Sequence, residues 1–92
     1  MREEVERRRR RRRDRVYIIA ELLKIAKRGA LKTQLMYGAN LSFAQLSDYL
    51  SFLISIGLLR TLQEGNKVIY KTTSEGFEFL ANYDRIISLL GE

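Results

Sequence analysis

The chain has 92 residues, a length that forms one domain with a modest hydrophobic core, and its net charge is +6. It contains neither cysteine nor histidine, which excludes disulfides, thiolate nucleophiles, histidine general bases and the usual zinc ligands. We therefore expect no enzyme activity, no metal and no cofactor. No apolar run approaches the roughly 18 to 20 residues needed to cross a bilayer, so no membrane partner is expected either.

Residues 1–15 form a strongly basic arm. They carry nine arginines against four acidic side chains, whereas residues 16–92 have a net charge of only +1. Arginine binds phosphate through a planar fork of hydrogen bonds, so the arm predicts sequence-independent contacts with a polyanion. The predicted contacts are Arg7, Arg8, Arg9, Arg10, Arg11, Arg12 and Arg13. The alternative is a solvated helical extension supported by i,i+4 Glu–Arg pairs. RNA is an alternative partner, because an arginine run does not distinguish the two nucleic acids.

A folded domain is predicted over residues 16–92, and its first helix over residues 16–28. The apolar belt of this helix is unusually wide, which indicates burial against a second subunit as well as against its own domain. Gly29 is a natural residue to end the helix. Ala30 and Leu31 form a short link with one or two residues of strand.

Residues 32–59 predict a helix-turn-helix unit, with a short helix over residues 33–38, a tight turn and a longer helix that Ser42 begins and Gly57 ends. Leu46, Leu50 and Leu53 form the buried face of the second helix, flanked by Phe43 and Tyr49. The opposite face suits a DNA major groove, where Gln pairs with adenine, Ser with several base edges, and Ala with the thymine methyl. The predicted groove contacts are Ser42, Ala44, Gln45, Ser47 and Ser51, with Lys32 on an adjoining phosphate. The alternative is an ordinary pair of helices in an all-α domain.

After Gly57 the pattern changes to that of two strands, over residues 58–63 and 68–73. Thr, Val, Ile, Leu and Tyr predominate, and the intervening Gly65-Asn66 favours a tight hairpin. A helix-turn-helix followed directly by a hairpin is the winged-helix order. The wing, residues 58–73, offers Arg60, Lys67 and Lys71 as phosphate contacts, although each is otherwise an ordinary solvated strand residue.

The last helix begins at Thr73 or Ser74 and carries an apolar stripe at spacings of three and four residues. The stripe is wider than one small core requires and predicts a dimer interface, although the helix can instead pack on its own domain. The predicted interface residues are Phe77, Leu80, Tyr83, Ile87 and Leu90.

Several short motifs carry a family resemblance. They are Lys32-Thr33, Met36-Tyr37, Ala39-Asn40-Leu41-Ser42, Tyr49-Leu50, Phe52-Leu53, Gly57-Leu58-Leu59 and the pattern of Thr73, Gly76, Phe79 and Leu80. Over residues 16–87 the chain resembles an archaeal winged-helix family of small chromatin-associated DNA-binding dimers and related transcriptional regulators. The resemblance implies a homodimer that binds double-stranded DNA, with the Ser42 helix in the major groove and dimer contacts on the last helix. The chain departs from the family pattern in two ways. Its last helix stops near Leu90, and its recognition helix has no Lys or Arg and includes Asp48.

The sequence thus predicts a mainly α fold with a small β-hairpin, a winged helix-turn-helix that dimerises through its terminal helices. The predicted function is a dimeric transcriptional regulator in the cytoplasm, associated with the nucleoid. Residues 42–56 would read bases, while the wing and the arm bind phosphates. The alternatives are a chromatin-type DNA coat without sequence preference and a protein-interaction adaptor.

Overall fold

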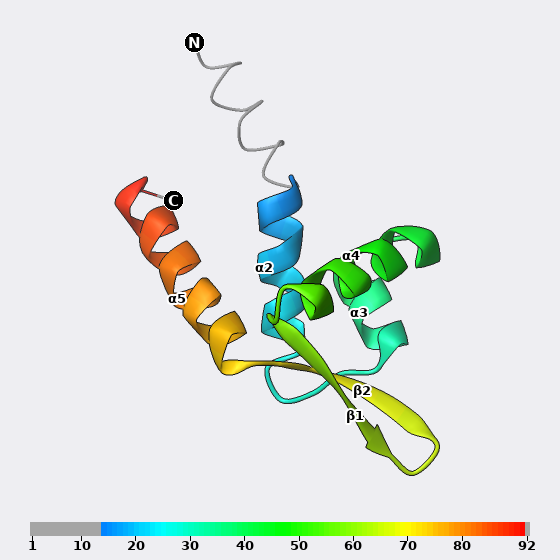
Figure 1. Ribbon diagram of the computed structural model, residues 1–92. Helices are drawn as coiled ribbons and strands as arrows, with labels where there is room; N and C mark the ends of the chain where they lie inside the picture. Colours follow the sequence, from blue (N-terminus) through cyan, green and yellow to red (C-terminus); the bar gives the residue numbers. More distant parts are fainter. Residues whose placement is uncertain (1–13, 92) are drawn as a thin grey trace.

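The computed structural model describes residues 14–91, in which four helices and a two-stranded antiparallel sheet surround one core. The helices are α2 (Arg15–Ile25), α3 (Lys32–Gly38), α4 (Phe43–Ser55) and α5 (Ser74–Leu89), and the strands are β1 (Leu59–Glu64) and β2 (Lys67–Thr72). Helix α2 lies in the centre, with α5 on one side and α3 and α4 on the other, and the hairpin projects beside α3 (Figure 1). This confirms the predicted mainly α fold with a small β-hairpin. None of these helices is both long enough and apolar enough to span a bilayer.

Helix α2 differs from the predicted helix at both ends. It begins at Arg15, because Oδ1 of Asp14 accepts a hydrogen bond from the Tyr17 N–H at 2.9 Å and caps the helix. Asp14 and Arg15 had both been predicted as part of the arm. The helix ends at Ile25 rather than residue 28, and residues 26–28 form a turn that Gly29 closes with a φ of +99°. Asp14 and Arg15 therefore belong to the folded domain.

The wide apolar belt of α2 is covered by the chain itself. Leu22 and Leu23 are fully buried, and α2 contacts both α3 and α5 as well as β2. A helix in the middle of a small domain needs apolar side chains on more than one side. The predicted burial of the belt against its own domain is therefore confirmed, and the predicted contact with a second subunit stays a prediction. Val16, which was expected on the buried face, is 49% exposed because it lies in the first turn, at the edge of the core.

The root of the hairpin is held by hydrogen bonds from β2 and from Thr73, the residue that follows it. Thr72 is buried, and its Oγ1 donates to the carbonyl oxygen of Leu23 at 2.7 Å, which caps a free carbonyl near the end of α2. The Oγ1 of Thr73 donates to the Gly57 carbonyl at 2.6 Å. Ala30 and Tyr70 exchange two backbone hydrogen bonds of 2.9 and 2.8 Å, so the predicted short strand after α2 exists as a single bridge. These bonds attach the hairpin to α2 and to the loops.

The strands are shifted by one residue from their predicted bounds. Leu59 pairs with Thr72 and Glu64 with Lys67, which leaves Gly65-Asn66 as a two-residue turn. Gly65 has a φ of +60° whereas Asn66 does not have a positive φ. This combination is typical of a type II′ turn, in which the first central residue is glycine.

Helix α5 begins after Thr73, whose side chain accepts from the Gly76 N–H at 3.1 Å. Of the predicted interface residues, Leu80 is only 3% exposed and lies in the core of its own chain. Tyr83 is half-buried and stacks on Phe79 with ring centroids 6.5 Å apart. The stripe therefore divides, because Leu80 and Tyr83 pack against the domain while the end of α5 diverges from α2 (Figure 1).

Candidate nucleic-acid interface

A four-residue turn joins α3 to α4. Asn40 adopts a φ of +55°, a conformation that Asn tolerates better than most residues because its side chain can hydrogen-bond locally. The Leu41 N–H donates to the Met36 carbonyl at 3.0 Å, and Ala39 is buried against the core. The turn is short and internally bonded, so the orientation of α4 relative to α3 is fixed. This is the helix-turn-helix geometry that the sequence predicted.

Two predicted base-reading residues form a capping box at the start of α4. The Ser42 Oγ accepts from the Gln45 N–H at 3.1 Å, and the Gln45 Oε1 accepts from the Ser42 N–H at 3.0 Å. Ser42 was expected to cap the helix, but the reciprocal bond from Gln45 was not predicted. The signal was present, since Ser-x-x-Gln before an apolar run is the capping-box pattern. The side-chain amide nitrogen of Gln45 is thus the donor it has left for a base.

The rest of α4 divides into the predicted faces. Leu46, Leu50 and Leu53 are buried. The predicted groove contacts lie elsewhere on the helix: Ser42, Ala44, Gln45 and Ser51 are exposed, and Ser47 is half-buried. Asp48 is also exposed, which adds a negative charge to a helix that has no Lys or Arg. Helix α4 therefore has little electrostatic attraction of its own for DNA.

Phe43, at the first position of α4, does not pack beside the buried leucines as the sequence suggested. Its side chain is 63% exposed, and the Nζ of Lys32 lies over the ring at 4.1 Å from the centroid. The first turn of α4 lies on the side of the molecule away from α5, where no further helix or strand of residues 14–91 covers it (Figure 1). The helical period places Phe43 near Leu50 in angle, but it carries no information on whether a neighbour covers the first turn.

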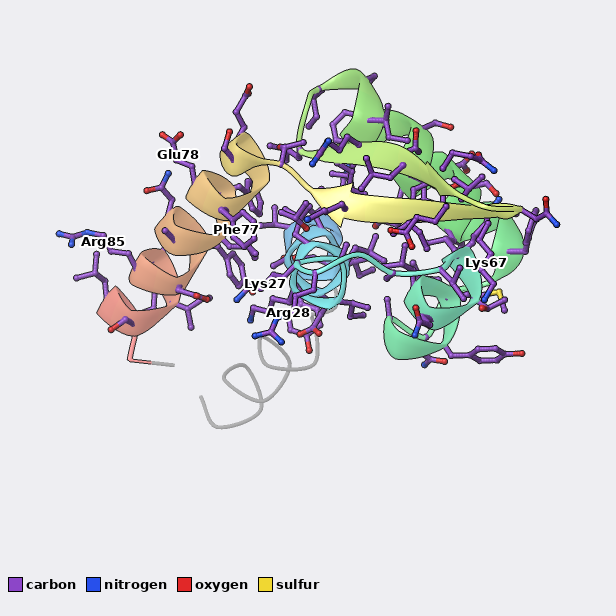
Figure 2. All side chains as sticks on the ribbon, turned by 90° about the horizontal axis from the view of Figure 1, so that it is seen from below. Lys27, Arg28, Lys67, Phe77, Glu78 and Arg85 are labelled. Atoms are coloured by element: carbon purple, nitrogen blue, oxygen red, sulfur yellow. The ribbon has the colours of Figure 1, made fainter. Side chains whose placement is uncertain are left out.

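The predicted wing contacts share one face of the hairpin. Arg60 and Lys71 are direct partners across the strands, and Lys67 pairs with Glu64 next to the turn. Paired residues of an antiparallel sheet project to the same face, and like charges in direct opposition repel each other. Arg60 and Lys67 are exposed, while Lys71 is half-buried. Lys67 lies toward the hairpin tip, on the side of the molecule opposite Arg85 (Figure 2).

Two further exposed cations were not predicted as phosphate contacts. Lys27 and Arg28 lie at the C-terminal end of α2, between α5 and α3 in the view of Figure 2. The sequence suggested that they complement the negative end of the helix dipole, which does not require them to face a ligand. The predicted arm contacts, residues 7–13, lie outside the described residues.

The start of α2 also contacts α4. The Arg15 guanidinium lies over the Phe52 ring, 4.3 Å from its centroid, and a shallow depression there is lined by Arg15, Asp48, Tyr49 and Phe52. The described chain therefore begins beside the middle of α4. Within residues 14–91 no group of three or more acidic side chains is placed to hold a metal ion.

Comparison with known proteins agrees with this architecture. A sequence model described as winged helix-turn-helix matches residues 12–91. An uncharacterized protein of Methanocaldococcus jannaschii is 38% identical over 81 residues, covering 80% of this chain and 84% of that protein.

Two solved structures share the fold at low sequence identity. Sso10a-2, a DNA-binding protein from Sulfolobus solfataricus, aligns with a TM-score of 0.76 and 22% identity over 85% of this chain and 82% of that one. MepR, a transcription regulator of the Staphylococcus aureus multidrug efflux pump MepA, aligns with a TM-score of 0.72 and 12% identity over 83% of this chain and 57% of that one.

Proposed function

The chain belongs to the winged helix-turn-helix family, and on this premise we propose that it is a dimeric transcriptional regulator that binds double-stranded DNA. The observation that carries the proposal is the division of α4 into a buried leucine face and an exposed face of small polar side chains, within a rigid helix-turn-helix and beside a cationic hairpin. Such a helix fits a major groove with its N-terminal residues toward the base edges. The fold shared with a DNA-binding protein and a transcription regulator supports the same function.

Affinity in this proposal comes mainly from phosphate contacts outside α4. Arg60 and Lys71 repel each other across the hairpin, and a phosphate placed between them removes that cost. Lys67 and the arginines of residues 7–13 add further positive charge, and Lys32 lies beside the first turn of α4. If about six to eight cations per dimer contact phosphates, log K should fall against log salt with a slope of about −5 to −7.

The dimer in this proposal forms through the end of α5. Ile86, Leu89 and Leu90 are large apolar side chains that are each more than half exposed in the single chain, whereas Phe77, which is 43% exposed, lies near the start of α5 and outside this interface. Exposed apolar side chains repeated along one helix favour burial against a partner. The proposed interface differs from the predicted stripe, because Leu80 is used by the core and Ile86 and Leu89 are added. We propose that the dimer acts in the cytoplasm, on the nucleoid.

One observation favours a second candidate function. Asp48 is exposed on α4, and α4 carries no cation, so this helix can also serve as a surface for another protein while the arm alone holds nucleic acid. In that case the protein is an adaptor, or a chromatin-type coat that binds DNA without sequence preference. The two candidates differ in whether the folded domain selects a DNA sequence.

The test compares the full chain with a full-length variant in which the seven arginines of residues 7–13 are replaced by glutamine. Both are used to select ligands from a random duplex library, and both are titrated across a range of salt concentrations with the selected duplex, a scrambled duplex and a double-stranded RNA. We expect the variant to bind more weakly and with a shallower salt slope, yet to prefer the selected duplex. Two results together would contradict base reading by α4 and favour the coat or the adaptor: the variant binds no duplex, and the wild type binds all duplexes alike.

A further inference from the structure

The first turn of α4 has few hydrogen-bonding groups left for a base. The Ser42 Oγ and the Gln45 Oε1 accept bonds from each other's backbone N–H in the capping box. Between them in the sequence lie Phe43 and Ala44, both exposed. The part of the helix that enters a groove first therefore presents an aromatic ring and a methyl group, together with two side-chain donors, the Ser42 hydroxyl and the Gln45 amide.

The ring of Phe43 is held in place although it is exposed. The Lys32 Nζ lies over it, 4.1 Å from the centroid, which is well within the range of a cation–π contact. Lys32 is the first residue of α3, so two helices fix the position of the pair. A cation beside an exposed ring suits a surface that meets a phosphate and an apolar base group together.

The major groove offers one apolar group on its base edges, the C5-methyl of thymine. We propose that Phe43 is a specificity-determining residue that packs against a thymine methyl while Lys32 binds an adjoining phosphate. This inference rests on the proposed binding of duplex DNA by α4. It adds a thymine contact that neither the exposed serines nor Gln45 supplies, and it gives a reason for a large apolar side chain at the start of a recognition helix.

Isolated exposed aromatic side chains are common on protein surfaces, so exposure alone does not carry the inference. What carries it is the combination of exposure, fixation by Lys32, and a first turn whose acceptors are already used. The competing use of such a ring is stacking on an unpaired base, which is tolerant of base identity and requires a single strand. The two uses differ in their dependence on a methyl group in duplex DNA.

The experiment uses the full-length protein and the variants Phe43→Ala and Tyr37→Ala. Tyr37 is a matched control, because it is an exposed aromatic residue on α3 that has no assigned DNA contact. Each protein is titrated with an alternating adenine–thymine duplex, with the same duplex containing uracil in place of thymine, and with a single-stranded oligonucleotide. Uracil lacks the C5-methyl and keeps the hydrogen-bonding groups. Circular dichroism checks that the variants fold.

We expect uracil to weaken binding of the wild-type protein and of Tyr37→Ala by about fourfold for each methyl contacted, and to weaken binding of Phe43→Ala less, since only a methyl contacted by Ala44 then remains. Equal binding of the two duplexes by the wild type would overturn the inference, as would a uracil effect in Phe43→Ala as large as in the wild type. If Phe43→Ala weakens binding only to the single-stranded oligonucleotide, the Phe43 ring stacks on unpaired bases and the inference is overturned. If the wild type binds no duplex at all, the proposed function itself fails, which is a different result from duplex binding without methyl dependence.

Discussion

Replacing Thr72 with valine tests whether the buried hydrogen bond at the root of the hairpin stabilises the domain. Valine has nearly the same shape but lacks the hydroxyl that donates to the Leu23 carbonyl at 2.7 Å. That carbonyl lies in the last turn of α2, where no helical N–H is available to replace the lost donor. Because Thr72 is buried, water cannot easily take the place of the hydroxyl. The variant should therefore leave a polar group unsatisfied in the core.

The expected cost is about 1 to 3 kcal/mol, the desolvation penalty of one buried carbonyl without its partner. For a domain of this size each kcal/mol lowers the melting temperature by about 4 to 8 °C. Valine favours strands at least as well as threonine does, so propensity should not add to the loss. The lower half of the range is expected if the backbone moves to admit a water molecule.

The assay is thermal and urea-induced unfolding followed by circular dichroism, with all proteins at one concentration so that any dimerisation affects them equally. Thr72→Ser keeps the hydroxyl and should recover part of the stability, although it loses a buried methyl group. Thr61→Val changes an exposed threonine on the partner strand and should be nearly neutral. Equal melting temperatures for Thr72→Val and Thr61→Val would refute the reasoning.

Three further changes test the cap, the α5 contact and the wing. Ser42→Ala removes the acceptor for the Gln45 N–H and should lower the free energy of unfolding by about 0.5 to 2 kcal/mol, whereas Ser42→Asp should retain most of it, as measured by urea unfolding. Gly76→Ala places a methyl group against the Leu58 carbonyl and should cost about 1 to 3 kcal/mol in the same assay; a neutral result would mean that α5 can shift. Replacing Arg60 and Lys71 with glutamine removes four cations from the proposed dimer, so it should weaken binding to all duplexes alike and lower the magnitude of the salt slope by about 3 to 4, as titration at several salt concentrations would show.

Short-range signals explain why so much of the local structure could be predicted. Ser42 caps α4 and Gly57 ends it with a φ of +83°, as each residue type favours, whereas α2 ends at Ile25, before the predicted stop at Gly29. The order of a helix-turn-helix and a hairpin follows from where the apolar period changes. These features depend on residues that are close in sequence, so their physical causes are visible in the sequence itself.

The predictions from sequence that were wrong concern which side chains are covered by another element of the fold. Phe43 and Leu80 both belong to predicted apolar stripes, but the first is exposed and the second is buried in its own chain. The period of a helix gives the direction of a side chain and does not say whether another element covers it. The same limit applies to α2, whose wide belt contacts α3 and α5 of its own chain as predicted, while its predicted contact with a second subunit stays a prediction. The predicted base-reading residues could be placed on a face, but the mutual capping of Ser42 and Gln45 reduces what they can offer to a base.

The attachment of the hairpin at one end has a consequence for how this scaffold accommodates insertions. Its hydrogen bonds to the rest of the domain come from Tyr70, Thr72 and Thr73, whereas the residues of the turn, 64–67, are exposed. Extra residues inserted between Gly65 and Asn66 would leave the bonds at the root intact, and each doubling of a loop costs only about 0.6 kcal/mol in closure entropy. The reach of the hairpin can therefore be lengthened, or a label placed at its tip, without redesigning the core.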